Sequence, residues 1–103
     1  MNNERIKVIK QYINDNIKIL GDLEKDLGDK EVSRMLIKEE VESLIKDYLY
    51  TIIMGTTEQV LAFRIELKEV AEKLQDYLRE IEEKTNQHDE EIYRVYSDML
   101  LII

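Results

Sequence analysis

Between Val60 and Ile81, apolar residues recur at alternating spacings of three and four positions. This spacing places side chains on one face of an α-helix. Thr56 precedes the run and Gln59 follows Thr56 by three positions, a pattern typical of a capping box at a helix start. We therefore predict a helix over residues 57–84, whose seam comprises Val60, Phe63, Leu67, Val70, Leu74, Tyr77 and Ile81.

A first helix is expected to begin near Glu4. Its seam, in which Asn16 is the only polar member, continues past Gly21 to Leu27. Either the helix ends near Leu20, at Gly21, or it continues through this glycine at a cost of about 1 kcal/mol. The continued seam favours a helix that extends to Leu27, with Gly28 after its last turn, as glycine often occurs at helix ends. The polar Asn16 is interpreted either as a partly wetted edge residue or as one that fixes the register of helix association.

Two further helices are predicted over residues 30–54 and 89–101. Asp29 is the expected cap of the former, and Asn86 or Asp89 of the latter. Their predicted inner faces are broad. In residues 30–54 this face holds Val32, Met35, Leu36, Val41, Leu44, Ile45, Tyr48, Leu49, Ile52 and Ile53, and in the last helix Ile92, Val95, Tyr96, Met99 and Ile103.

The connections between these segments are short, and the chain is suited to long helices. It contains no proline and only three glycines, and 37% of its residues are charged. A turn of two or three residues after position 54 requires the flanking helices to run antiparallel. We predict that residues 1–103 form one all-α domain. It would be an up-down antiparallel helical bundle of three long helices and a shorter C-terminal helix, with coiled-coil-like seams.

Composition also limits the expected functions. The chain lacks cysteine, an N-terminal signal-peptide pattern and the run of about 20 apolar residues that a membrane span needs. A cytoplasmic protein with no membrane partner is therefore expected. The net charge of −8, concentrated in residues 39–103, repels phosphate and disfavours direct nucleic-acid binding. No phosphate-binding loop or catalytic triad pattern occurs, so we expect no enzyme, cofactor or metal.

Apolar residues outside the main seams gather where the second and third helices meet, and again at the end of the sequence. Contiguous exposed apolar residues usually mark an interface. We predict a non-enzymatic structural or adaptor protein that forms a homo-oligomer, with a dimer expected first, or docks on another protein. The alternative is that the first and fourth helices cover these residues within one molecule. The predicted interface residues are Tyr50, Ile53, Met54, Leu61, Ile65, Leu101 and Ile103.

Acidic rows suggest a second hypothesis. Glu72, Asp76, Glu80 and Glu83 recur along the third helix. Such rows could mimic nucleic acid and occupy the basic groove of another protein, and that binding would weaken steeply with salt.

Paired acids suggest a third hypothesis. Glu39 and Glu42 form an E-x-x-E pair, which is similar to one half of the magnesium site of the all-α nucleoside triphosphate pyrophosphohydrolases. That resemblance implies a helical hydrolase with a second, E-x-x-D pair on the next helix. The nearest matches there combine Glu72 with Glu69 or Asp76, and both depart from the pattern. His88 and Glu91 could together supply two metal ligands, whereas a solvated loop histidine is the simpler interpretation.

Overall fold

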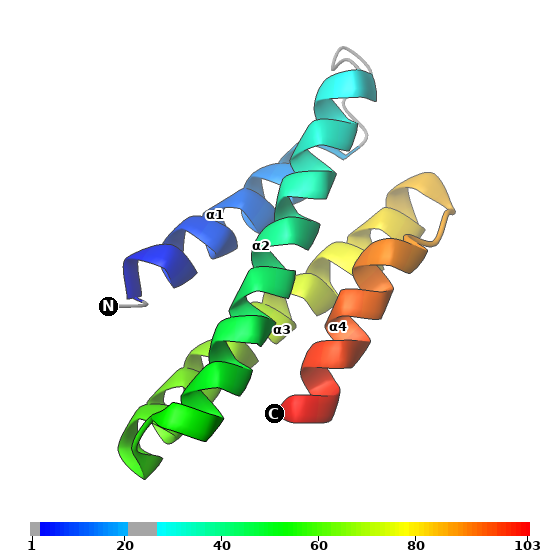
Figure 1. The fold of residues 1–103 in the computed structure, drawn as a ribbon. Helices are drawn as coiled ribbons and strands as arrows, with labels where there is room; N and C mark the ends of the chain where they lie inside the picture. Colours follow the sequence, from blue (N-terminus) through cyan, green and yellow to red (C-terminus); the bar gives the residue numbers. More distant parts are fainter. Residues whose placement is uncertain (1–2, 21–26) are drawn as a thin grey trace.

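The computed structural model describes residues 3–20 and 27–103, and these residues form four helices and no strand. The helices are α1 (Asn3–Ile19), α2 (Leu27–Met54), α3 (Thr57–Thr85) and α4 (Glu90–Ile102). Successive helices run in opposite directions along a molecule about 47 Å long (Figure 1). The predicted all-α up-down bundle is confirmed. Within the described part of the chain, no helix is both long enough and apolar enough to cross a lipid bilayer.

The end of α1 and the start of α2 differ from the prediction. The helix α1 ends at Ile19, and Leu20 lies in a turn whose N–H donates to the carbonyl of Ile17 at 3.3 Å. Of the two predicted ends, the one near Leu20 agrees with the structure, and the favoured continuation to Leu27 is wrong. Residues 21–26 of that continuation lie outside the described residues. Since α2 already includes Gly28 and Asp29, neither residue has the predicted terminal role. The three-four spacing of apolar residues identifies one face of a helix but does not fix the residue at which the helix ends.

The ends of α3 and α4 are defined by side-chain caps. Thr56 Oγ1 accepts from the Gln59 N–H at 3.2 Å, and Gln59 Oε1 accepts from the Thr56 N–H at 2.9 Å, which confirms the capping box. Of the two proposed caps for α4, Asp89 has this role, because its Oδ1 accepts from the Ile92 N–H at 3.1 Å. Asn86 instead ends α3 in a left-handed conformation, with φ of 54°.

The core is built from one apolar face of each helix. The predicted seam of α3 is buried from Phe63 to Tyr77, and α4 buries Ile92, Val95 and Met99. In α2 the buried face is narrower than predicted and includes Ile37, which the prediction omitted. That face consists of Ile37, Val41, Leu44 and Tyr48, whereas Val32, Leu36, Leu49, Ile52 and Ile53 are exposed.

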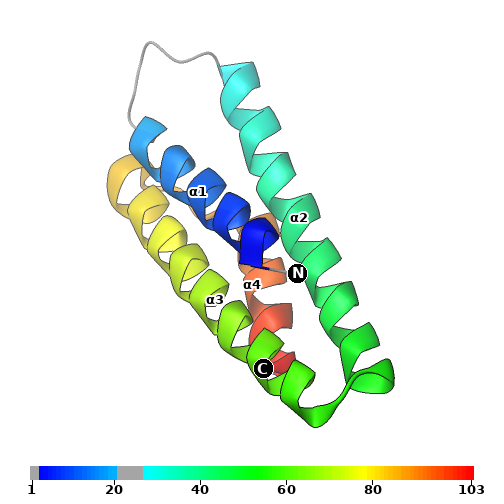
Figure 2. The same cartoon turned by 90° about the vertical axis from the view of Figure 1, so that its left-hand side faces the viewer.

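The end of the α2–α3 hairpin projects beyond the other two helices (Figures 1 and 2). Near the start of α1, Arg5 pairs with Asp47 and donates to Ser43, so α1 begins level with these residues of α2. The helix α4 starts beside Arg34 and has 13 residues, or about 20 Å. Both helices therefore stop before the last turns of α2. Residues 48–65, at the end of this hairpin, are called here the hairpin tip.

Candidate interaction surface

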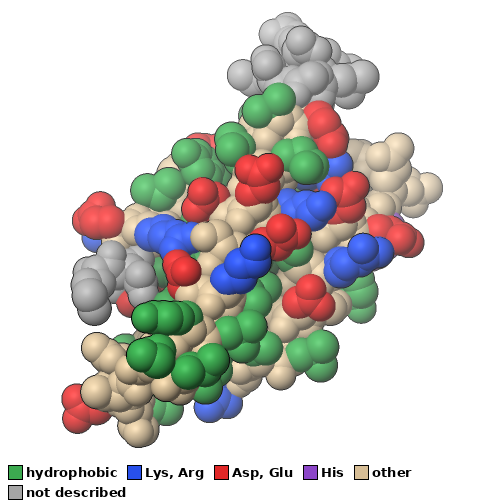
Figure 3. Space-filling view, in the orientation of Figure 1, with side chains coloured by type: hydrophobic (Ala, Val, Ile, Leu, Met, Phe, Trp, Pro, Cys, Tyr) green, Lys and Arg blue, Asp and Glu red, His purple; other side chains and the backbone are tan. Residues whose placement is uncertain are grey.

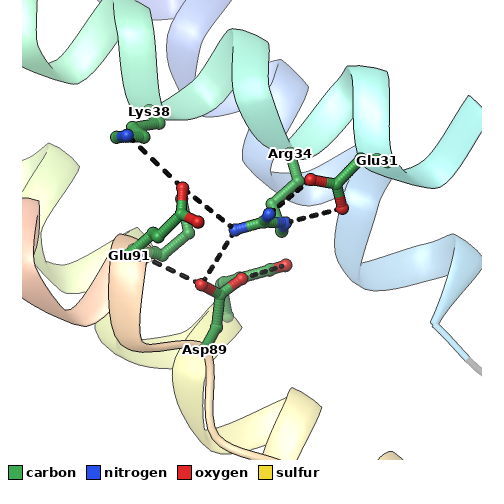
Figure 4. Close-up of polar contacts among 7 residues, drawn as sticks. Glu31, Arg34, Lys38, Asp89 and Glu91 are labelled. Atoms are coloured by element: carbon green, nitrogen blue, oxygen red, sulfur yellow. Dashed lines mark hydrogen bonds and ion pairs between the residues drawn. The ribbon is translucent and has the colours of Figure 1, made fainter.

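The side of α2 that faces α4 changes from charged to apolar along its length. Arg34 and Lys38 face α4, where Arg34 Nη1 lies 3.1 Å from Asp89 Oδ1 and Lys38 Nζ lies 3.3 Å from Glu91 Oε2 (Figure 4). Helical spacing of three, four and seven residues keeps positions on one side. The same side therefore continues through Ile45, Leu49 and Ile52, and Ile53 lies one turn beyond Leu49.

These four residues, Ile45, Leu49, Ile52 and Ile53, are called here the apolar flank. Ile45 is half-buried and packs against the core, close to the level at which α4 ends. Towards the C-terminus of α2 the side chains become more exposed to solvent: Leu49 is 43%, Ile52 47% and Ile53 77% exposed. Figure 3 shows hydrophobic side chains gathered over the C-terminal half of α2, while charged side chains cover the neighbouring part of the same face. The flank is thus an apolar helix face that α4 is too short to cover.

The hairpin tip is also depleted of charge. Its 18 residues contain one acid, Glu58, and one base, Arg64, and so have no net charge, whereas the whole chain carries −8. Across the ends of α2 and α3, Tyr48 and Phe63 pack edge to face with ring centroids 5.5 Å apart. Depletion of charge at the centre of a surface is typical of protein–protein interfaces.

The predicted interface residues are placed on several faces. Tyr50, Ile53 and Met54 are exposed near the end of α2. Leu61 and Ile65 are exposed on α3, but each lies two positions from the buried Phe63, which is roughly 200° around the helix. They consequently point away from α2.

The two predicted interface residues at the C-terminus also differ in exposure. Leu101 is 85% exposed, whereas Ile103 is half-buried and packs against the core.

Sequence reasoning missed Leu49 and Ile52 as surface residues, because it assigned both to the inner face of the second helix. Their apolar character suits either environment, and the hydrophobic pattern alone does not separate the two. The predicted helix lengths could have identified these surface residues, because a fourth helix of about 13 residues cannot cover the whole side of a second helix that is twice as long. That comparison would have left the last turns of α2 without a neighbour on the α4 side.

A polar network at the other end of α4 holds it against α2. Asp89, nearly buried, contacts Arg34 and accepts from the Tyr77 hydroxyl at 3.4 Å (Figure 4). Burial raises the pKa of Tyr77, and the neighbouring Asp89 carboxylate raises it further. The hydrogen bond from Arg34 lowers the pKa of Glu31. Asp89 also caps α4, so this network of Asp89, Arg34, Glu31 and Tyr77, called here the α2–α4 latch, holds the start of α4 beside α2.

A cavity of about 550 Å³ opens beside the latch, with Asn16, Ile81 and His88 in its lining. Its polar groups are largely engaged: Asn16 donates to the Tyr12 carbonyl at 2.9 Å, and Arg34 is held by its acidic neighbours. The charged groups of this lining that contact one another between α2 and the start of α4 are Arg34, Asp89 and Glu91.

Several residues named in the nucleic-acid-mimic and metal-site hypotheses form ion pairs with neighbouring side chains. In the acidic row, Asp76 lies 3.2 Å from Arg79 and Glu80 lies 3.4 Å from Lys84. His88 is exposed in the loop before α4, as the simpler interpretation has it, and lies 3.2 Å from Glu82.

The carboxylates compared with the hydrolase pattern are similarly placed. Glu69 pairs with Lys10 at 2.8 Å, Glu39 and Glu72 are exposed, and Glu42 is half-buried. Within residues 3–20 and 27–103, no group of three or more His, Asp or Glu side chains is arranged to hold a metal ion. Comparisons with protein-family models, curated proteins and solved structures find no match to this chain.

Proposed function

We propose that this protein is a non-enzymatic interaction module that binds another protein chain through the apolar flank and the hairpin tip. The observation that carries the proposal is the continuation of an apolar helix face past the end of α4. The exposed fractions of Leu49, Ile52 and Ile53 sum to about 1.7, so these residues together expose as much surface as about 1.7 fully exposed residues. At about 1.5–3 kcal/mol per buried side chain, covering them contributes roughly 2.5–5 kcal/mol to binding.

Photo-crosslinking in the source organism tests this proposal. A benzophenone amino acid replaces Leu49, and in a matched strain it replaces Val32, which is also exposed and lies on the same helix. We expect irradiation to produce a covalent adduct with another polypeptide from position 49 and not from position 32. Illumination that gives no adduct at position 49, or equal adducts at both positions, contradicts the proposal.

A further inference from the structure

We infer that the chain covering the apolar flank is a second copy of this protein, packed about a two-fold axis that passes near Leu49. The inference rests on the proposed function and names its partner. Three properties of the described residues support it: the distribution of charge, the pattern of the flank, and the amount of apolar surface.

Charge favours an arrangement in which two hairpin tips overlap. Two copies that each carry −8 repel one another wherever their acidic surfaces approach. The hairpin tip has no net charge and lies at one end of a molecule about 47 Å long. Overlapping tips place the acidic bodies at opposite ends of the dimer, beyond the Debye length of about 8 Å at physiological salt. A basic partner would gain little at this site, because the tip offers almost no charge to attract it.

The spacing of the flank is compatible with self-pairing. When two α2 helices cross antiparallel with the axis near Leu49, this residue meets its own copy. Ile45 then lies opposite Ile53 of the partner subunit, and Ile52 lies opposite the partner's Lys46, whose aliphatic stem can cover it while the ammonium group reaches water. The symmetry repeats both contacts. The α3 helices flank the pair, so the two tips form a short intermolecular four-helix arrangement. Each copy thereby supplies to the other the apolar cover that its own α4 is too short to provide.

The exposed area indicates a dimer of moderate affinity. Leu49, Ile52 and Ile53 expose the equivalent of about 1.7 side chains. At about 25 cal/mol per Å², the free energy that covering them contributes corresponds to roughly 100–200 Å² of apolar surface per subunit. Each partner of a standard interface buries about 800 Å². The adjoining tip residues would supply the remainder. We therefore expect a dissociation constant in the micromolar range, and a solution mass that rises with protein concentration.

Sedimentation equilibrium between 1 and 300 µM tests the inference with the purified chain. Leu49→Glu and, separately, Ile53→Glu should raise the dimer dissociation constant at least 30-fold, because each substitution occurs twice in the interface. Leu36→Glu is the matched control, since Leu36 is 42% exposed on the same helix, and should leave the constant unchanged. Circular dichroism checks that every variant keeps its helicity. Raising sodium chloride from 50 to 500 mM should preserve or strengthen the dimer.

A disulfide experiment tests the predicted axis. The chain has no cysteine, so a single introduced thiol can pair only with its copy. Leu49→Cys should form a covalent dimer under mild oxidation, whereas Val32→Cys should stay monomeric. A Leu49→Cys variant that does not cross-link while Ile65→Cys does would place the interface on the outer side of α3 and overturn the inference.

A wild-type chain that remains monomeric at 300 µM also overturns the inference, as does equal weakening by the Leu36 and Leu49 substitutions. These results are distinguishable from failure of the proposed function. If the chain is monomeric but the photo-crosslink at position 49 captures a different protein, the interaction surface stands and only the identity of its partner is wrong. If no adduct forms, both proposals fail.

Discussion

Replacement of Asp89 by alanine tests whether the α2–α4 latch stabilises the bundle. The substitution removes a helix N-cap, which is worth about 1 kcal/mol. It also removes the contacts to Arg34 and Tyr77. Breaking a fully buried ion pair costs about 3–5 kcal/mol, but Arg34 is 19% exposed and keeps its contact with Glu31, so a smaller loss applies. We expect the free energy of unfolding to fall by about 2–3 kcal/mol.

That loss is large for a domain of this size. A stability of about 0.05–0.15 kcal/mol per residue gives a 103-residue chain roughly 5–15 kcal/mol. At about 4–8 °C per kcal/mol, Tm should drop by about 10–20 °C. Urea unfolding followed by circular dichroism at pH 7 measures the change, and the denaturant slope should stay constant.

Asp89→Asn provides the control for this prediction. Asparagine caps a helix nearly as well as aspartate, so this variant should lose only about 1–2 kcal/mol. A loss of about 1 kcal/mol or less for Asp89→Ala is what a cap alone is worth, and it would refute a contribution from the contacts to Arg34 and Tyr77. Equal losses for the two variants would show that capping contributes nothing and that the carboxylate charge is responsible.

Gly55→Ala should destabilise the hairpin turn by about 1–3 kcal/mol, because a Cβ there would lie 2.7 Å from the backbone oxygen of Thr51. A thermal melt within 2 °C of the wild type would contradict this. Burial, with a further contribution from Glu69, raises the pKa of Glu66, whose Oε2 is buried without a hydrogen-bond partner among the described residues. Glu66 therefore contributes stability at acidic pH that is lost as the pH rises through its folded-state pKa. Glu66→Gln should accordingly be more favourable, relative to the wild type, at pH 7 than at pH 4 in urea titrations, and the opposite order would refute the reasoning.

Much of this fold could be predicted because its signals are local. The capping box at Thr56 and the seam of α3 depend on residues within a few positions of one another, so the sequence alone defined that helix. The boundary between α1 and α2 was predicted wrongly because a three-four pattern says which residues are apolar, and does not say where the backbone stops being helical. Asp89 was recognised as a possible cap, but its contacts are with Arg34, 55 positions away, and Tyr77, 12 positions away.

The sequence by itself determined the helical class, the hairpin turn at Gly55 and an apolar surplus near residues 48–65. Only the tertiary structure decided which of these apolar residues stay exposed to solvent. Leu44 and Leu49 are chemically identical and lie on the same helix, yet one is fully buried and the other is 43% exposed. The difference arises because burial depends on which neighbouring helices reach a given level of the bundle. The contact between Arg34 and Asp89, which are 55 positions apart, places the start of α4 beside α2, and from that start its 13 residues leave the apolar flank uncovered.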